Sequence, residues 1–180
     1  FENNPTYGNN QLPGAPPFLG DTRTAEGRAA IAARLAAHMG EEARGTPRFV
    51  EAPGHSFSDV AKKVVSIIGL SSLQALEQAA GAKLDPLRFR ANVYVSGGSP
   101  WAEFDWIGRE ILLGQARLRI VKRIVRCPAT EVNPATAERD AAPPRWLRDH
   151  FGHADLGVYA EVLEGGRISV GDALEVTDPD

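Results

Sequence analysis

The longest regular pattern of apolar and polar positions in the chain runs from Arg117 to Cys127. Its even-numbered positions are mostly apolar, and its odd-numbered positions include three arginines. Because side chains of a β-strand alternate between the two faces of a sheet, the pattern predicts a strand with one core face and one cationic face. Pro128 cannot donate a ladder hydrogen bond, so the strand should end there, with Cys127 on the cationic face. A β-bulge would exchange the two faces beyond it.

A second alternating stretch covers residues 88–95. It places Phe89, Ala91, Val93 and Val95 on one face of a predicted strand and four polar residues, which include Arg88, Arg90 and Asn92, on the other. Two guanidinium groups and a carboxamide in a row offer many hydrogen-bond donors to a phosphate or a heterocycle edge. A solvated outer face is the alternative interpretation.

Shorter patterns predict the other elements. Apolar spacing and glycine stops predict a helix that begins within residues 22–24 and runs to Met39, and helices over residues 71–80 and 143–151, the second of the three opened by a capping box of Ser71 and Gln74. Strands are expected at 48–51, 64–68 and 111–113, and a hairpin with a Gly-Gly turn at 157–170. Many short strands with glycine turns and few helices favour a mostly-β barrel with a few short helices, α+β overall. We expect a flexible arm over residues 1–21 and a single domain over 22–180, with a helical insertion at its start.

Composition limits the class of protein. The chain has 180 residues, 43% hydrophobic and 24% charged, which is enough for one substantial core. It has no apolar run that could span a bilayer, and its net charge of −3 argues against a general nucleic-acid binder. One cysteine excludes an internal disulfide framework and fits a reducing, cytoplasmic compartment. Residues 88–127 nevertheless hold eight basic residues against three acids, which suggests a compact anionic ligand or scattered solvated charge.

Seven short motifs come in the order and spacing of one known family. They lie within residues 50–177, and together they resemble the MOSC domain of molybdenum-cofactor sulfurases and amidoxime-reducing enzymes. One departure is Ala91, where many members have proline. The motifs are Arg88-Phe-Arg-Ala-Asn92, Trp101-Ala-Glu-Phe-Asp105, Ile107-Gly108, Arg126-Cys127, Thr130-Glu-Val-Asn-Pro134, Gly157-Val-Tyr159 and Ile168-Ser-Val-Gly-Asp172.

The resemblance implies a β-barrel that binds the molybdenum cofactor, a molybdopterin with an anionic phosphate. By the same resemblance Cys127 would ligate molybdenum and be the catalytic residue, and Arg90, Asn92, Arg126 and Tyr159 would bind the cofactor. A thiolate suits such a metal, arginines suit phosphate, and a cationic neighbourhood favours the thiolate form of a cysteine. The family usually begins with a strand that carries a lysine near the cofactor. Residues 1–20 do not resemble it, so we expect that segment, like the cysteine-desulfurase domain, to be missing.

Three functions are compatible with these residues. The first is a molybdenum-dependent reductase of small N-hydroxylated or N-oxide substrates, supplied with electrons by a separate partner protein. The second is a non-catalytic sulfur-carrier or cofactor-delivery module with a persulfide on Cys127. The third is a barrel that binds another phosphorylated ligand without metal. Fold alone does not decide between them.

Overall fold

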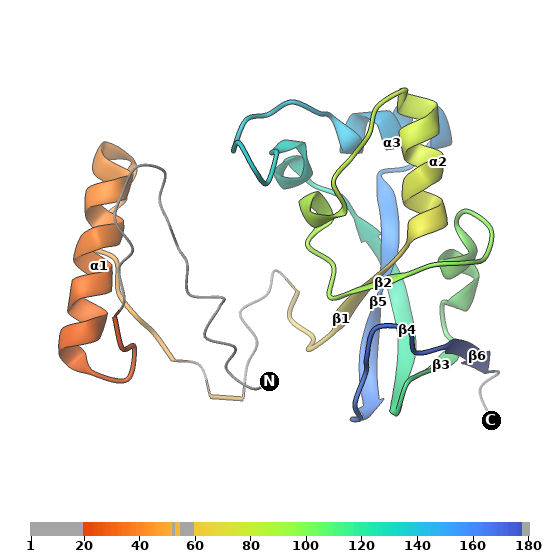
Figure 1. Cartoon of the computed structure of the whole chain (residues 1–180), viewed down its shortest axis with the longest axis horizontal. Coiled ribbons are helices and arrows are strands. Elements are labelled where there is room, and N and C mark those ends of the chain that lie inside the picture. Colours follow the sequence, from red (N-terminus) through yellow and green to blue (C-terminus); the bar gives the residue numbers. More distant parts are fainter. Residues whose placement is uncertain (1–19, 52, 55–59, 178–180) are drawn as a thin grey trace. The chain divides into compact units, whose positions relative to one another are not determined.

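A computed structural model of the chain describes residues 20–51, 53–54 and 60–177 (Figure 1). The chain forms two compact units, Phe1–His55 and Ser56–Asp180. The expected arm at residues 1–21 lies outside the described residues except for Gly20 and Asp21. In the part of the chain that is described, no helix is both long and apolar enough to cross a membrane.

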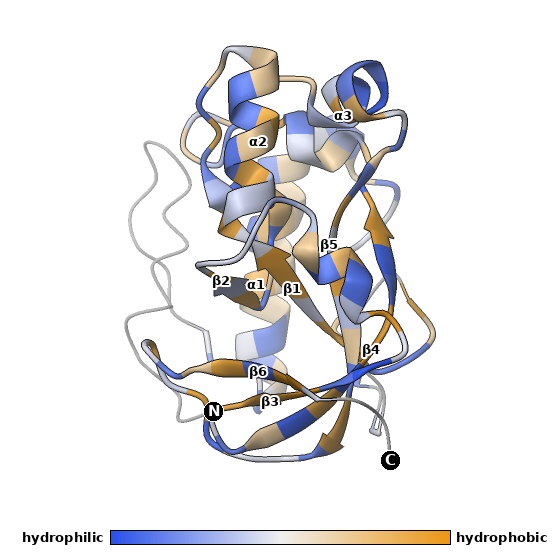
Figure 2. Ribbon diagram, turned by 90° about the vertical axis from the view of Figure 1, so that its right-hand side faces the viewer, coloured by the Kyte–Doolittle hydropathy of each residue, from blue (hydrophilic) through white to orange (hydrophobic). Residues whose placement is uncertain are grey.

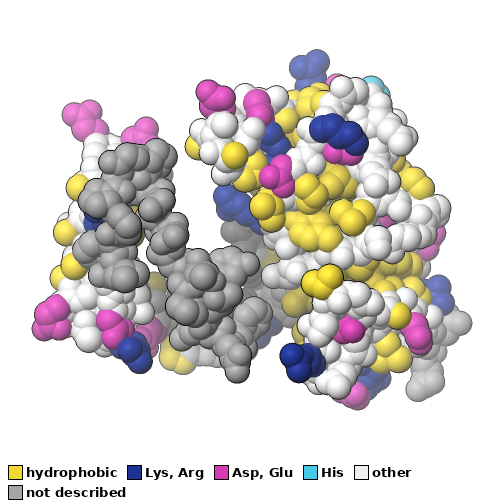
Figure 3. All heavy atoms as spheres, viewed as in Figure 1, with side chains coloured by type: hydrophobic (Ala, Val, Ile, Leu, Met, Phe, Trp, Pro, Cys, Tyr) yellow, Lys and Arg dark blue, Asp and Glu magenta, His cyan; other side chains and the backbone are white. Residues whose placement is uncertain are grey.

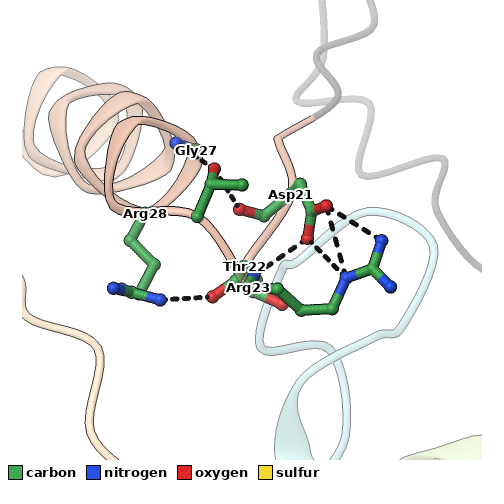
Figure 4. A network of polar contacts seen from close by, with 6 residues as sticks. Asp21, Thr22, Arg23, Gly27 and Arg28 are labelled. Carbon is green, nitrogen blue, oxygen red and sulfur yellow. Dashed lines mark hydrogen bonds and ion pairs between the residues drawn. The ribbon is translucent and has the colours of Figure 1, made fainter.

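The first unit contains helix α1, Ala25–Met39, followed by the 3-10 helix η2, Gly40–Glu42. The predicted helix is confirmed at both ends. The hydroxyl of Thr24 accepts a hydrogen bond from the Gly27 amide at 3.0 Å, and Gly40 with positive φ ends the helix. The strand expected at residues 48–51 is wrong, because this segment pairs with no other strand. Further contacts before the helix join Asp21 to Arg23 and Thr22 to Arg28 (Figure 4).

The second unit is built on a curled six-stranded sheet with the order β2-β1-β5-β4-β3-β6. Strands β3 and β6 turn away from the direction of β1 and β5, as Figure 2 shows. All neighbouring pairs are antiparallel except β1 with β2. This half-barrel confirms the expected fold class. The strands are β1 (Val65–Gly69), β2 (Val93–Val95), β3 (Glu110–Leu113), β4 (Ala116–Val125), β5 (Asp155–Glu164) and β6 (Leu174–Thr177).

Helices cover one end of this sheet. Helices α2, Leu70–Ala80, and α3, Pro143–Phe151, lie near one another there (Figure 1). The predicted ends at Gly81 and Gly152 are confirmed, and both glycines adopt the left-handed conformation. Three 3-10 helices connect the strands: η3 (Pro86–Phe89), η4 (Ala102–Trp106) and η5 (Pro128–Glu131).

Apolar side chains form a core cluster on each face of the sheet. Ile67 of β1 and Ile120 of β4 belong to the cluster enclosed by the curl of the sheet. Ile68, the next residue of β1, belongs to the other cluster, which includes Leu76 of α2 and Leu147 of α3. Adjacent residues of β1 therefore serve opposite faces, as the two-residue period of a strand requires.

Three predictions of local structure are wrong. The strand expected at residues 88–95 is the 3-10 helix η3 followed by the short β2, so Arg88 and Phe89 are both buried. Residues 168–170 form no strand, and β6 pairs with β3 instead of completing a hairpin with β5. The start of α2 has no capping box. The buried carboxylate of Glu103 instead accepts hydrogen bonds from the Gly69 amide at 3.4 Å and from the Ser72 hydroxyl at 2.7 Å.

A β-bulge interrupts the alternation of β4. Ile120 faces Ala160, but Lys122 faces the adjacent residue Tyr159, so Val121 has no partner in β5. The expected two faces are confirmed for the first half of the strand, where residues 116, 118 and 120 are buried. Beyond the bulge, the prediction that odd-numbered residues stay on one face is wrong. The Arg123 guanidinium lies 4.2 Å from the ring centroid of Phe104, on the enclosed face, so Arg123 does not share a face with the arginines before the bulge.

Candidate functional site

Cys127 lies exposed where β4 leaves the sheet. It is the residue before η5, whose first position is Pro128, a residue pre-organised for the start of a helix. The Cys127 carbonyl accepts hydrogen bonds from the Thr130 hydroxyl at 2.9 Å and from the Thr130 amide at 3.1 Å. The backbone of Cys127 is therefore fixed, while its thiol faces solvent.

Arg126 is buried and hydrogen-bonded to the main chain. Its Nε donates to the Leu156 carbonyl at 2.8 Å and its Nη1 to the Phe89 carbonyl at 3.1 Å, while Nη2 also donates to Leu156. Burial lowers the pKa of Arg126 to about 10, and the charges of Tyr159, Tyr94 and Cys127 act in the opposite direction. Arg126 therefore ties β4 to β5 and to η3, and it remains a cation at neutral pH.

Gly157 allows this close packing. It has φ 77°, and a Cβ atom there would lie 2.4 Å from the Ile67 carbonyl oxygen and 3.3 Å from Nη2 of Arg126. Only glycine fits a position that combines positive φ with such a contact. The Gly157-Val-Tyr159 motif thus has a structural reason at its first residue.

Asn92 and Tyr159 lie on either side of Ser66, in one row across neighbouring strands. Asn92, just before β2, accepts hydrogen bonds at Oδ1 from the amide and the hydroxyl of Ser66 in β1, both at 2.9 Å. Ser66 pairs in register with Tyr159 of β5, which in turn pairs with Lys122 of β4. Residues paired directly across strands point to the same face of a sheet, so these side chains share one surface. The amide nitrogen of Asn92 and the hydroxyl of Tyr159 have no hydrogen-bond partner among the described residues.

Arg90 and Arg88 differ sharply. Arg90 is exposed in a left-handed conformation at the end of η3, and its side chain has no ion-pair partner among the described residues. Arg88, expected beside it on a polar face, is buried. Its Nη1 donates to the Glu131 carbonyl at 3.1 Å and its Nη2 to Asp140 at 2.5 Å, whereas its Nε is buried without a partner. Arg88 therefore holds the end of η5, the turn that follows Cys127.

Most arginines of β4 are neutralised by acidic side chains. Arg117 pairs with Glu110 at 2.8 Å and also with Glu164, and Arg119 pairs with Glu110 at 2.7 Å. The local excess of positive charge is thus not one anion-binding cluster. In the space-filling view of this unit, hydrophobic side chains gather near the middle of the visible face and basic side chains are scattered around them in separate groups (Figure 3).

The donor set fits a metal that brings its own organic ligand. Among the described residues no three His, Cys, Asp or Glu side chains gather to hold a metal ion. A lone thiol would complete the coordination of a metal already chelated by another molecule, but would not hold a bare ion. The Asn92 amide, the Tyr159 hydroxyl and the Arg90 side chain, which has no ion-pair partner among the described residues, are polar groups available to such a molecule.

Comparison with known proteins decides the family. The family model of the MOSC domain matches residues 35–175. The chain belongs to the MOSC domain family. Curated proteins of this family include relatives associated with the molybdenum cofactor. The chain is 30% identical over 120 residues to mitochondrial amidoxime-reducing component 1 of Mus musculus, a match that covers 60% of the chain and 35% of that protein.

Two further likenesses agree with this membership. The chain is 33% identical over 73 residues to molybdenum cofactor sulfurase of Danio rerio, which covers 40% of the chain and 8% of that protein. The chain therefore spans about a third of the mouse relative and less than a tenth of the fish relative. Its fold is similar to the crystal structure of YiiM from Geobacillus stearothermophilus, with a TM-score of 0.50, 19% identity, and coverage of 63% of this chain and 54% of that chain.

The structure thus joins Asn92 and Tyr159 through Ser66, and Arg126, next to Cys127 in the chain, interacts electrostatically with Tyr159. Arg90 lies two positions before Asn92 in the chain, and its placement at a common site stays a prediction. Sequence reasoning missed Ser66, which anchors Asn92, and Lys122, which the bulge turns toward Tyr159. The sequence did contain one indication of the role of Ser66, because it is a polar residue inside an apolar strand. No pattern in the sequence marks the bulge.

Proposed function

We propose that this MOSC domain binds the molybdenum cofactor, with Cys127 as the protein ligand of the metal, and reduces N-hydroxylated or N-oxide compounds. The similarity to a mouse protein named as an amidoxime-reducing component supports the substrate class. Reduction of an N-hydroxyl group takes two electrons and two protons, cleaves the N–O bond and releases water. The chain has one cysteine and so cannot itself build a four-cysteine iron–sulfur cluster, and the proposal therefore includes an electron donor outside these residues.

The observation that supports cofactor binding most strongly is the setting of Cys127. The only thiol of the chain is exposed, its backbone is fixed by Thr130, and the preceding residue is a buried cation. The charge of Arg126 interacts with both Cys127 and Tyr159, so the thiol and the polar row lie within electrostatic reach of one guanidinium. The thiolate is the form of a cysteine that ligates metals.

Each residue has a specific part in this proposal. The bound group supplies molybdenum, which changes oxidation state during two-electron transfer. Cys127 holds the metal through its thiolate, and Arg126 keeps β4, β5 and η3 in place around it. The Asn92 amide and the Tyr159 hydroxyl donate hydrogen bonds to polar edges of the pterin. Arg90 offers its guanidinium to an anionic part of the group.

A second function rests on the same thiol. A fixed, exposed cysteine next to a buried cation also suits a persulfide, so a sulfur-carrier or cofactor-delivery role for Cys127 is the alternative. The similarity to a molybdenum cofactor sulfurase favours this alternative. The two roles differ in what the purified protein carries.

The experiment compares wild type, Cys127→Ser and Arg119→Gln purified from a host that makes molybdenum cofactor. Arg119 is an exposed, ion-paired residue of the same strand, so its variant is a matched control. We expect molybdenum and pterin near one per chain in wild type and in the control, and loss of molybdenum in Cys127→Ser. Molybdenum retained in Cys127→Ser would refute the ligand assignment.

Turnover and mass separate the two roles. Wild type that holds molybdenum should reduce a hydroxylamine with reduced methyl viologen as donor, and Cys127→Ser should not. A carrier would instead show the mass of one added sulfur atom on Cys127 and no turnover.

A further inference from the structure

The bulge in β4 places one lysine in the polar row. Lys122 pairs in register with Tyr159, and its Nζ lies 5.7 Å from the centroid of the Tyr159 ring. With unbroken alternation, Lys122 would lie on the enclosed face with Leu118 and Ile120. The extra residue Val121 turns it to the face of Ser66 and Tyr159 instead.

Lys122 also differs from its cationic neighbours in its partners. Arg117 and Arg119 pair with glutamates, and Arg123 lies 3.9 Å from Asp155. Lys122 has no acidic partner within the described part of the chain, and its ammonium group lies over the aromatic ring of Tyr159. An ammonium held over a ring face keeps its charge and its three donors for another group.

A ligand that contacted both Lys122 and Cys127 would have to be elongated. Cys127 lies five positions after Lys122, which corresponds to about 16 Å of extended chain. Tyr159 pairs directly with Lys122, and it also interacts electrostatically with Arg126, the residue before Cys127. A thiol at one end suits a metal, and a lysine at the other suits an anion.

We propose that Lys122 binds the phosphate monoester of the ligand that lies over Tyr159 and Asn92. This assignment builds on the proposed function and adds the residue that would recognise the anionic end of the cofactor. The same assignment applies to another phosphorylated ligand, because the lysine ammonium binds a phosphate as a point charge.

Two measurements test the role of Lys122 with Lys122→Gln and the control Arg119→Gln, which removes the same charge from the same strand. In the first, inorganic phosphate is titrated into cofactor-free protein at constant ionic strength, and the amide resonances of Lys122 and Tyr159 are followed. We expect saturable shifts in wild type and Arg119→Gln and about tenfold weaker binding in Lys122→Gln. In the second, pterin content is measured after dialysis of protein from a cofactor-producing host, and Lys122→Gln should retain several-fold less than the control.

The outcomes separate this proposal from the proposed function. Dependence on Lys122 in either measurement supports the anion site. If wild type carries no pterin but binds phosphate through Lys122, the cofactor function fails and the anion site stands for another phosphorylated ligand. If Lys122→Gln and Arg119→Gln behave alike in both measurements, the anion site is overturned, whether or not wild type holds pterin. Urea unfolding of both variants confirms that each is folded, as their exposed positions lead us to expect.

Discussion

The two ends of the β4–β5 pair are held by different chemistry, although the same two strands form both (Figure 1). At one end Arg117 faces Glu164, and exposed ion pairs join the strands. At the other end, Arg126 is buried and donates to main-chain carbonyls, and Gly157 brings β5 close to β1. Charged side chains at the first end are screened by water, whereas those at the second must be satisfied inside the protein.

This difference indicates at which end of the strand pair substitutions are tolerated. Exposed ion pairs tolerate replacement because water can solvate each partner alone. Buried donors and acceptors do not, because loss of one partner leaves the other unsatisfied. The buried end is also the one that carries Cys127, so the thiol lies where substitutions should cost most.

The largest effect is expected from Gly157→Ala. The added methyl group would lie 2.4 Å from the Ile67 carbonyl oxygen, which is a steric clash, and alanine is strained at the positive φ of this position. Together these two effects should lower the free energy of unfolding by about 3–5 kcal/mol. Gly165→Ala is the matched control, since a Cβ atom at Gly165, just beyond β5, meets nothing within 4 Å. Urea denaturation of both variants measures the difference. Equal stabilities would show that the buried end is no more constrained than the exposed end.

Arg126→Met should have the second-largest effect on the free energy of unfolding. It removes three hydrogen bonds from a charged group, worth about 1.5–3 kcal/mol each. Removal of the buried charge offsets about 3 kcal/mol of this loss, because burial lowers the pKa of Arg126 to about 10. We expect a net loss of about 2–4 kcal/mol in the free energy of unfolding, since the carbonyls of Leu156 and Phe89 are left without donors. The loss should be constant between pH 6 and 9, because Arg126 stays protonated there. A loss no larger than that of Arg119→Gln would contradict the comparison.

Arg88→Met should cost less, about 1–3 kcal/mol, because two hydrogen bonds are lost and one nitrogen was already without a partner. It should also loosen η5, which Arg88 holds through the Glu131 carbonyl, and so speed the reaction of Cys127 with a thiol reagent. Arg139→Gln serves as control, because Arg139 contacts the same turn from an exposed position. Thiol reaction rates equal in the two variants would remove the link between Arg88 and Cys127.

The smallest effect belongs to the exposed end and depends on pH. The hydrogen bond from Arg119 lowers the pKa of Glu110 from its ordinary value of 4.5, with a further contribution from Arg117. The stabilisation by Glu110 is therefore fully present above that value and is lost as the pH falls through the lowered pKa of the folded state. Wild type should be slightly more stable than Glu110→Gln at pH 7, and the difference should vanish in acid. A difference that persists in acid would show that packing, not charge, is responsible.

The sequence predicts elements whose determinants are local. Thr24 and Gly40 delimit α1, Gly152 ends α3, and the apolar positions of β4 before the bulge are buried as expected. Each of these depends on residues within a few positions, so one pattern suffices. The family membership was likewise accessible from short motifs in order.

Other features depend on distant residues and were not predictable in this way. Glu103 takes the place of the expected capping box at α2, from a segment some thirty residues away. The alternation of residues 88–95 breaks because Arg88 and Phe89 have buried partners in other segments, which outweigh the strand pattern. The candidate site was named from the resemblance, but its arrangement around Ser66 and Lys122 comes from strand pairing and the bulge at Val121.

The hydrogen bonds of Arg126 have a consequence for the order of events during folding. They join residues 30 and 37 positions apart in the chain, so the surroundings of Cys127 are non-local. Long-range contacts of this kind form late, because the intervening loops must close first. During synthesis the environment of the thiol cannot exist until Leu156 has left the ribosome. Until then Cys127 is an ordinary cysteine, and any group that requires the finished site must arrive after β5 has been made.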